Sequence, residues 1–149
     1  MSKEWFANWF DSEYYHILYK NRDFSEAEQF VSNLINHLNP IQSATFLDLA
    51  CGKGRHSVFI NKLGYTTTGL DLSEYSIGTA KKSENDSLTF DVHDMREVYQ
   101  LDAFNYILNL FTSFGYFENE IENLNVLISI KRALKPNGIV VIDFLNPQY

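Results

Sequence analysis

The segment that decides the fold is TFLDLACGKGRHS, residues 45–57. Its first six residues form a short, mostly apolar run that is typical of a buried strand, and Gly52 and Gly54 then permit a tight turn. An amphipathic helical pattern follows and ends at Gly64. A strand, a glycine turn and a helix in this order indicate the first unit of an α/β domain.

The chain downstream of Gly64 repeats this alternation of strands and helices. Further strands are predicted at residues 66–70, 88–92, 104–110 and 139–144. A long helix precedes the last strand and ends at Lys135-Pro136-Asn137-Gly138. Its apolar residues, which we expect to point inward, are Ile121, Leu124, Leu127, Ile128 and Leu134. Connections of this length predict a doubly wound, mostly parallel sheet with right-handed crossovers.

The first 40 residues show helical patterns only, without the alternation of strands and helices seen in the rest of the chain. An aromatic stripe begins at Trp5, and a second helix is predicted from the capping box of Ser25 and Glu28 to a point just before Pro40. We therefore divide the chain into an N-terminal helical lid or cap, residues 1–40, and an α/β core, residues 41–149.

Composition narrows the range of functions. The 149 residues include 12 Lys and Arg against 19 Asp and Glu, a net charge of -7 that disfavours binding to nucleic acid or to an anionic membrane surface. The single cysteine, Cys51, permits no intramolecular disulfide, and no cysteine and histidine spacing predicts a metal site. A reducing, cytoplasmic setting is the expectation.

Acidic side chains and glycines follow successive strands. Asp48 and the glycine turn follow the first strand, Asp71 follows the second and Asp94 follows the third. Ligands of a doubly wound sheet bind beyond the carboxyl ends of the strands, so these residues predict one shared site for a nucleoside. A nicotinamide cofactor is disfavoured, because Ser57 replaces the third glycine of its fingerprint and Asp48 would repel a pyrophosphate.

These segments resemble a known family, the class I S-adenosylmethionine-dependent methyltransferases. Residues 46–54, FLDLACGKG, look like motif I of that family, and Gly69-Leu70-Asp71-Leu72-Ser73 resembles its acidic second motif. Asp94-Met95-Arg96 resembles the adenine-contact motif, and residues 132–139 are similar to the segment that leads into its fifth strand. The resemblance implies a Rossmann-like methyltransferase fold with strand order 3-2-1-4-5.

The resemblance also implies roles for individual residues toward S-adenosylmethionine as cofactor. Asp48, Asn109 and the turn around Ala50 would face the methionine part, Asp71 would hold the ribose, and Leu72, Asp94 and Met95 would surround adenine. Arg22 would pair with the cofactor carboxylate. The implied cofactor-binding set is Arg22, Asp48, Ala50, Cys51, Gly52, Gly54, Asp71, Leu72, Asp94, Met95 and Asn109.

The acceptor is expected to be a small molecule, methylated by in-line displacement. Candidates for its pocket are Tyr15, Tyr19, Phe114 and Tyr116. No residue is singled out as a general base, and the region of Tyr15, Tyr19 and Arg22 is either a lid or a solvated interhelical loop. Cys51 is expected to be an inert packing residue. The missing Pro-Pro-Tyr or Pro-Pro-Phe after Asn109 argues against DNA amino-methyltransferases.

Two alternatives remain beside a small-molecule methyltransferase: a non-catalytic nucleoside-binding fragment and, less favoured, an NAD-dependent oxidoreductase. Family members continue with strands 6 and 7, which have no counterpart before Tyr149. The expectation is therefore a C-terminally truncated chain, inactive or weakly active alone. Its fifth strand, with Val140, Val141 and Ile142, would be an exposed edge through which two copies self-associate.

Overall fold

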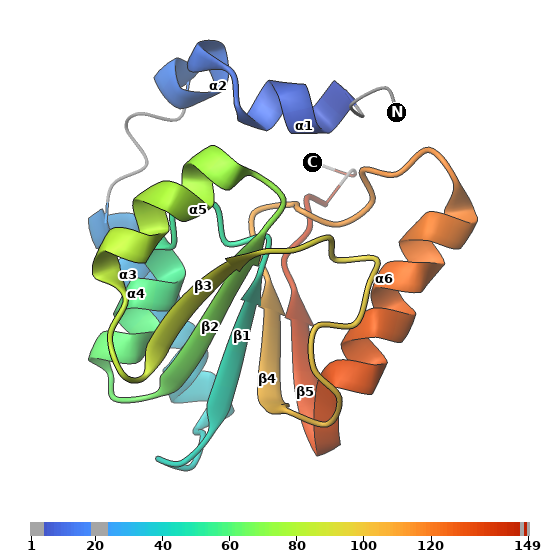
Figure 1. The fold of residues 1–149 in the computed structure, drawn as a ribbon. Helices are drawn as coiled ribbons and strands as arrows, with labels where there is room; N and C mark the ends of the chain where they lie inside the picture. The colour runs from blue at the N-terminus through green and yellow to red at the C-terminus, as the bar shows by residue number, and fades with distance from the viewer. Residues whose placement is uncertain (1–4, 19–23, 147, 149) are drawn as a thin grey trace.

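The protein is described by a computed structural model that covers residues 5–18, 24–146 and 148. Its centre is a five-stranded parallel sheet in the order β3-β2-β1-β4-β5, as predicted (Figure 1). The strands are β1 (Thr45–Leu49), β2 (Thr66–Asp71), β3 (Leu88–Val92), β4 (Phe104–Asn109) and β5 (Leu134–Ile142). The chain therefore has the α/β fold that the alternating pattern indicates.

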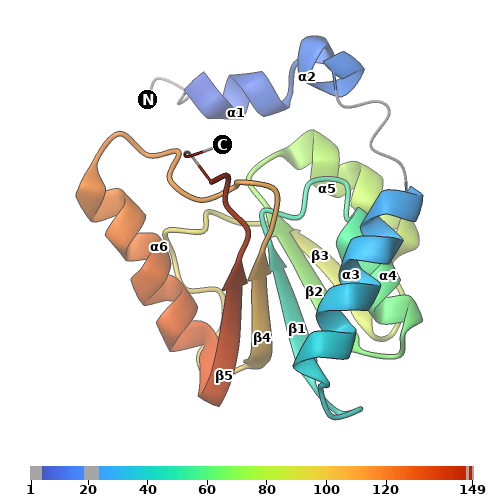
Figure 2. The ribbon, with the colours of Figure 1, turned by 180° about the vertical axis from the view of Figure 1, so that it is seen from behind.

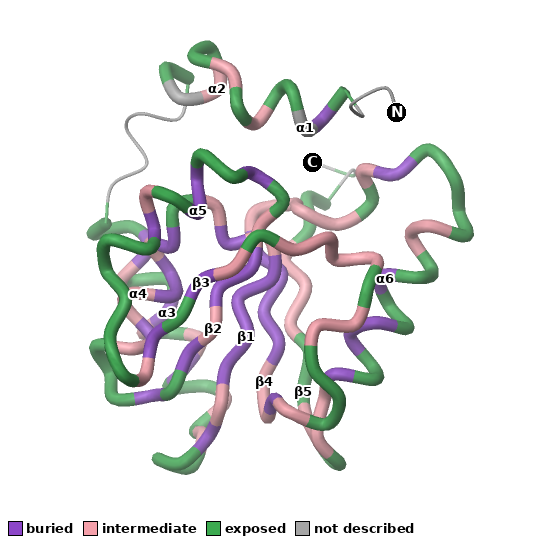
Figure 3. The backbone as a smooth tube through the Cα atoms, in the orientation of Figure 1, coloured by how far each residue is buried: buried purple, intermediate pink, exposed green. Residues whose placement is uncertain are grey.

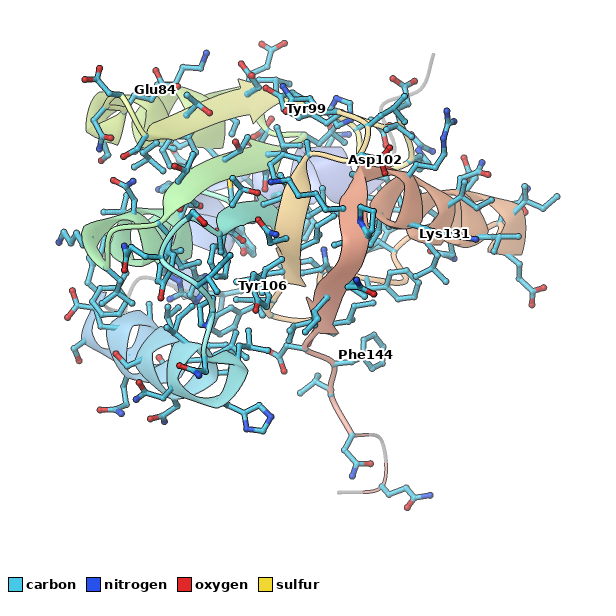
Figure 4. All side chains as sticks on the ribbon, turned by 90° about the horizontal axis from the view of Figure 1, so that it is seen from below. Glu84, Tyr99, Asp102, Tyr106, Lys131 and Phe144 are labelled. Atoms are coloured by element: carbon cyan, nitrogen blue, oxygen red, sulfur yellow. The ribbon has the colours of Figure 1, made fainter. Side chains whose placement is uncertain are left out.

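Helices cover both faces of this sheet. Helices α3, α4 and α5 pack on one face and α6 packs on the other, as the views from the front, from behind and from below show (Figures 1, 2 and 4). Their bounds are α3 (Phe24–Leu38), α4 (Arg55–Lys62), α5 (Glu74–Ala80, continued by a 3-10 turn at Lys81–Ser83) and α6 (Glu120–Ala133). Two short helices, α1 (Trp5–Phe10) and α2 (Glu13–Leu18), lie across the carboxyl ends of the strands.

The core divides between the two faces because side chains alternate along each strand. Leu47, Leu49 and Ile107 point toward α6, where they pack with Val126 and Ile130. On the opposite face Phe46 is fully buried against α3 and α4, and its ring stacks on Tyr106 with centroids 4.9 Å apart. The middle strands are consequently the most buried part of the chain (Figure 3).

The prediction for the inward face of α6 was wrong. Four of the five residues expected to point inward, Ile121, Leu124, Leu127 and Ile128, are exposed, and the fifth, Leu134, is partly buried and belongs to β5. The sheet instead contacts the stripe of Val126, Ser129, Ile130 and Ala133. Within this stripe, the Ser129 hydroxyl donates to the Glu97 carbonyl at 2.8 Å.

Strand β5 also begins earlier than expected. It pairs with β4 from Leu134, directly after α6, whereas the sequence indicated a turn as far as Gly138. The register shifts between the Phe104–Leu134 pair and the Tyr106–Ile139 pair, and Asn137 adopts a positive φ of 63° in the extra residues. The Lys-Pro-Asn-Gly segment thus forms an irregular part of the strand.

The outer edge of β5 is open in the described part of the chain. β5 pairs only with β4 there, and Ile139 and Val140 are 44% and 38% exposed. Phe144, just beyond the strand, is exposed as well. No helix among the described residues is long and apolar enough to cross a membrane.

Candidate functional site

A cavity of about 780 Å³ lies at the carboxyl ends of β1, β2 and β3, beneath α1. Its volume falls in the range of about 300–1,000 Å³ that is usual for small-molecule sites. Of the residues proposed for the cofactor, those that line it are Ala50, Gly52, Asp71, Leu72, Asp94 and Met95. Tyr15 and Tyr116, two candidates for the acceptor pocket, line the same cavity.

The turn after β1 approaches the cavity because three of its residues have positive φ. Ala50, Gly52 and Gly54 have φ values of 63°, 56° and 81°. A Cβ at Gly54 would lie 2.6 Å from the Phe90 ring, so side chains are excluded there on two grounds. Ala50 holds the left-handed conformation without being glycine, and its neighbour Cys51 donates its amide to the Leu70 carbonyl at 2.9 Å.

Asp71 is fixed in the cavity wall by two backbone amides. Its Oδ2 accepts from the Gly52 amide at 2.8 Å and its Oδ1 accepts from the Ser73 amide at 2.9 Å. Burial raises the pKa of Asp71, and these two hydrogen bonds oppose the rise without cancelling it. The carboxylate therefore joins the glycine turn to the N-terminus of α5, and each oxygen keeps a lone pair for a further donor.

The Ser73 side chain caps α5. Its Oγ accepts from the Ser76 amide at 3.1 Å and donates to Oδ1 of Asp11, which lies just beyond α1. This contact links the N-terminal helices to the α5 side of the cavity.

The Asp94 carboxylate is bound by Arg96, for which the sequence predicted no role. Nε and Nη2 of Arg96 donate to its carboxylate at 2.6–3.1 Å, and the Arg96 amide donates at 2.9 Å. Burial raises the pKa of Asp94, but these interactions with Arg96 outweigh it and hold the pKa below its usual value. Arg96 also pairs with Glu122 at 2.6 Å and lies over the Phe117 ring, 4.4 Å from its centroid.

Four other residues proposed for the cofactor and one for the acceptor do not line the cavity. The Asp48 carboxylate is buried beneath the glycine turn and accepts from the Ser57 hydroxyl at 2.6 Å, and burial raises its pKa to about 6. The Asn109 amide donates to the Leu49 carbonyl at 3.0 Å. Cys51, Gly54 and Phe114 are likewise not among the lining residues. Arg22 and Tyr19 lie outside the described residues.

Cys51 is buried, and burial raises the pKa of its thiol well above the ordinary value. A buried thiol that resists ionisation is a poor nucleophile, in accord with the expected packing role. Within the described part of the chain, no group of three or more histidine, cysteine or carboxylate side chains is placed to hold a metal ion.

His56 is buried on the α3 side of the sheet. Its ring stacks on Phe111 with centroids 5.0 Å apart, and burial, with Arg55 nearby, lowers its pKa to about 4. The imidazole is therefore neutral at pH 7, and it is not among the cavity-lining residues. This placement does not favour His56 as the base for a reaction in the cavity.

The loop after β4 begins with two consecutive left-handed residues, Phe111 and Thr112, with φ values of 60° and 56°. Asp143, just after β5, holds both. Its Oδ2 accepts from the Phe111 amide and its carbonyl accepts from the Thr112 amide, each at 3.1 Å. The Asp143 amide in turn donates to the Asn109 carbonyl at 3.0 Å, so the carboxyl ends of β4 and β5 are tied together.

Several lining residues were missed by the sequence analysis. Phe6, Phe10, Asp11, His93 and Phe117 line the cavity, and nothing in their local sequence distinguishes them from packing or surface residues. Phe6 packs edge-on against Phe117 with centroids 5.3 Å apart, which places α1 over the cavity.

Comparison with known proteins agrees with this geometry. A family model described as a methyltransferase domain matches residues 46–138. A dTDP-3-amino-3,4,6-trideoxy-alpha-D-glucopyranose N,N-dimethyltransferase of Streptomyces venezuelae is 28% identical over 134 residues, which cover 89% of this chain and 56% of that protein. A putative methyltransferase of Bacillus subtilis is 33% identical over 105 residues, covering 68% of this chain and 42% of the other.

Solved structures have the same fold. CalS10, an amino pentose methyltransferase from Micromonospora echinaspora, superposes with a TM-score of 0.72 at 20% identity, over 92% of this chain and 58% of the other. DesVI from Streptomyces venezuelae superposes with a TM-score of 0.70 at 28% identity, over 89% and 56% of the two chains. The chain spans about half the length of the curated relatives it matches. With the family model matching most of its length, the chain belongs to the class I S-adenosylmethionine-dependent methyltransferase family.

Proposed function

We propose that this chain binds S-adenosylmethionine in the 780 Å³ cavity and serves methyl transfer to a small-molecule acceptor. The observation that carries the proposal is the Asp71 carboxylate, held in the cavity wall by the amides of Gly52 and Ser73. A fixed carboxylate with unused lone pairs can accept hydrogen bonds from both hydroxyls of a ribose.

The surrounding residues fit the rest of this cofactor. Leu72 and Met95 offer apolar surface to the adenine ring, and Asp94 offers an acceptor to its exocyclic amine. Arg96 occupies much of the Asp94 carboxylate, so the adenine amine would share that carboxylate with the guanidinium. Carboxylates in the lining also suit a ligand that carries a sulfonium cation.

The proposed site residues that do not line the cavity would support it from outside. Asp48 places negative charge beneath the turn that would face the methionine part, and Asn109 fixes the end of β1 through the Leu49 carbonyl. Cys51 and Gly54 keep the turn close to Phe90 and the sheet. Phe114 packs against the core cluster that contains Phe6 and Phe117, two residues that line the cavity, and it would shape the acceptor pocket through them.

The N-terminal 40 residues act in this proposal as a lid. α1 contributes Phe6 and Phe10 to the cavity, and Asp11 contacts Ser73. Arg22 and Tyr19, outside the described residues, stay predictions as partners of the cofactor carboxylate and the acceptor. Bound S-adenosylmethionine supplies a methyl carbon already activated by positively charged sulfur, so positioning and exclusion of water by this lid can provide much of the acceleration.

The comparisons leave the acceptor open. Relatives are named for methylation of amino sugars, of glycine or sarcosine, and of an oxygen in ubiquinone biosynthesis. These names support a small-molecule acceptor, and they span nitrogen and oxygen. The net charge of -7 supports the absence of a nucleic-acid partner, and the cytoplasmic location stays a prediction.

A second candidate function is cofactor binding without turnover. The observation that favours it is the span of the chain, about half the length of its curated relatives. We further propose that two copies associate through the open edge of β5, where Ile139 and Val140 are exposed and the strand pairs on one side only among the described residues.

Calorimetric titration with S-adenosylhomocysteine tests the binding site. We expect the wild-type chain to bind it and not NAD, and Asp71→Asn to weaken binding by ~1–3 kcal/mol, because a buried hydroxyl then loses its charged partner. Asp86→Asn, at an exposed position outside the cavity, is the matched control. Equal affinity in Asp71→Asn would contradict the ribose role, and binding of NAD alone would overturn the proposed function. Transfer of a labelled methyl group to any acceptor would exclude the binding-only alternative.

A further inference from the structure

The acceptor end of the cavity is an aromatic corner, which we define as Phe10, Tyr15 and Tyr116. All three residues line the cavity. The Phe10 ring meets the Tyr15 ring with centroids 5.0 Å apart and planes at 83°, and it meets the Tyr116 ring at 5.5 Å and 78°. In such an edge-to-face contact the edge of one ring covers part of the face of the other, and all three side chains still belong to the cavity lining. Such walls attract a cation through the negative charge of the ring faces.

A carboxylate adjoins this corner. Asp11 follows Phe10 directly and lines the same cavity. One of its oxygens accepts from Ser73, and within the described part of the chain its other oxygen has no hydrogen-bond partner. Its negative charge contributes to the raised pKa of Asp71, which places the two carboxylates within electrostatic reach of each other.

The charges of the other lining residues point the same way. Asp71 and Asp94 belong to the nucleoside end of the proposed site, and Glu74 adds a further carboxylate. Arg96, the arginine among the described lining residues, forms ion pairs with Asp94 and Glu122. Within the described part of the chain, a phosphate or carboxylate on the acceptor would meet these carboxylates and a guanidinium that is already paired.

We propose that the acceptor is a basic amine without a phosphate or carboxylate beside the reacting nitrogen. It enters as an ammonium ion that the aromatic corner surrounds and Asp11 balances. This inference rests on the proposed function and adds the substrate class. It decides between the nitrogen and oxygen acceptors that the comparisons leave open.

The transfer balances with water as the proton acceptor. The bound ammonium loses one proton to solvent at the cavity mouth, which frees the nitrogen lone pair. That lone pair forms the new bond to the methyl carbon while the carbon–sulfur bond breaks and its electron pair stays on sulfur. The product is again an ammonium ion, so the corner also accommodates a monomethylated amine for a second transfer.

Matched probes test this inference on the protein saturated with S-adenosylhomocysteine. Cyclohexylamine, cyclohexanol and cyclohexanecarboxylate share a ring and differ in the charge of one substituent, and their affinities can be measured by NMR titration at pH 7.5. We expect the amine to bind about ten-fold or more tightly than the alcohol, and the carboxylate to bind most weakly. An alcohol that binds as tightly as the amine, or a carboxylate that binds more tightly, would overturn the inference.

Two variants locate the effect. Asp11→Asn and Tyr116→Leu should each weaken the amine about three- to ten-fold and leave the alcohol nearly unchanged, whereas Asp86→Asn should alter neither. Unchanged amine binding in both variants would refute the assignment of the corner. S-adenosylhomocysteine affinity is measured first for every variant. Retained cofactor binding with no preference for amines defeats only the substrate class, whereas loss of cofactor binding in the wild type defeats the proposed function and this inference together.

Discussion

Replacing Asp48 with asparagine should stabilise the protein at alkaline pH and have little effect in acid. The carboxylate is buried beneath the glycine turn, and burial raises its pKa from 3.8 to about 6 in the folded protein. The folded state therefore binds a proton more tightly than the unfolded chain. Stability linked to this proton is present below pH 3.8 and is lost as the pH rises through about 6.

The size of the effect follows from the shift. A difference of about two pKa units corresponds to about 3 kcal/mol, so ionised Asp48 lowers the free energy of unfolding by that amount at pH 8. Asparagine has nearly the same shape, keeps an oxygen for the Ser57 hydroxyl and carries no charge. Asp48→Asn should thus raise the free energy of unfolding by up to about 3 kcal/mol at pH 8, and by about 0.5 kcal/mol at pH 4.

Urea unfolding followed by circular dichroism at the two pH values measures this difference. Asp86→Asn, at an exposed position, serves as the control and should change stability by less than about 0.5 kcal/mol at either pH. A loss of stability in Asp48→Asn at pH 8, or a gain of equal size at both pH values, would refute the reasoning. The loss of stability would show that the hydrogen bond from Ser57 outweighs the desolvation of the Asp48 carboxylate. The equal gain would show that the pKa of Asp48 is not raised.

Gly54→Ala should lower the free energy of unfolding by about 2–4 kcal/mol in thermal or urea unfolding, because the added Cβ meets Phe90 and the backbone is left-handed. A change below 1 kcal/mol would contradict that geometry. The inosine analogue of S-adenosylhomocysteine carries a carbonyl oxygen in place of the adenine amine and should bind about ten-fold more weakly than S-adenosylhomocysteine. Arg96→Lys should reduce this ratio of affinities, because lysine cannot hold the Asp94 carboxylate in the same position. Equal competition by the analogue against wild type would exclude the adenine role. Light scattering across a concentration series should show mass rising with concentration if β5 edges pair, whereas a strict monomer at high micromolar concentration would contradict self-association.

The sheet could be predicted from the sequence because each strand carries its own signal. The five apolar runs predicted the strands, and the resemblance to the methyltransferase family implied the strand order that the structure shows. The helix end at Gly64 could be predicted in the same way, because a single left-handed backbone conformation decides it.

The α6 face could not be predicted in the same way. The helix carries one stripe of bulky apolar residues and another that includes Ser129 and Ala133, and the second is the stripe buried against the sheet. Hydrophobicity alone ranks these stripes in the opposite order. The side-chain contacts around the cavity could not be predicted from the sequence either. Asp11 and Ser73, for example, are 62 residues apart in the chain, and only folding brings them into contact.

The paired left-handed residues after β4 have a consequence for how this enzyme family can diversify. Thr112 is β-branched, and its φ of 56° costs on the order of 1–2 kcal/mol relative to glycine. Asp143, directly after β5, accepts hydrogen bonds from the backbone amides of this bend. These bonds fix the bend at the point where residues 113–117 begin. Substitutions after this bend would change the cavity wall at Tyr116, whereas Ala50, Gly52 and Asp71 line the cavity from the ends of other strands. Loop grafts between homologues should therefore be joined after Thr112, where the supporting framework is independent of what the loop recognises.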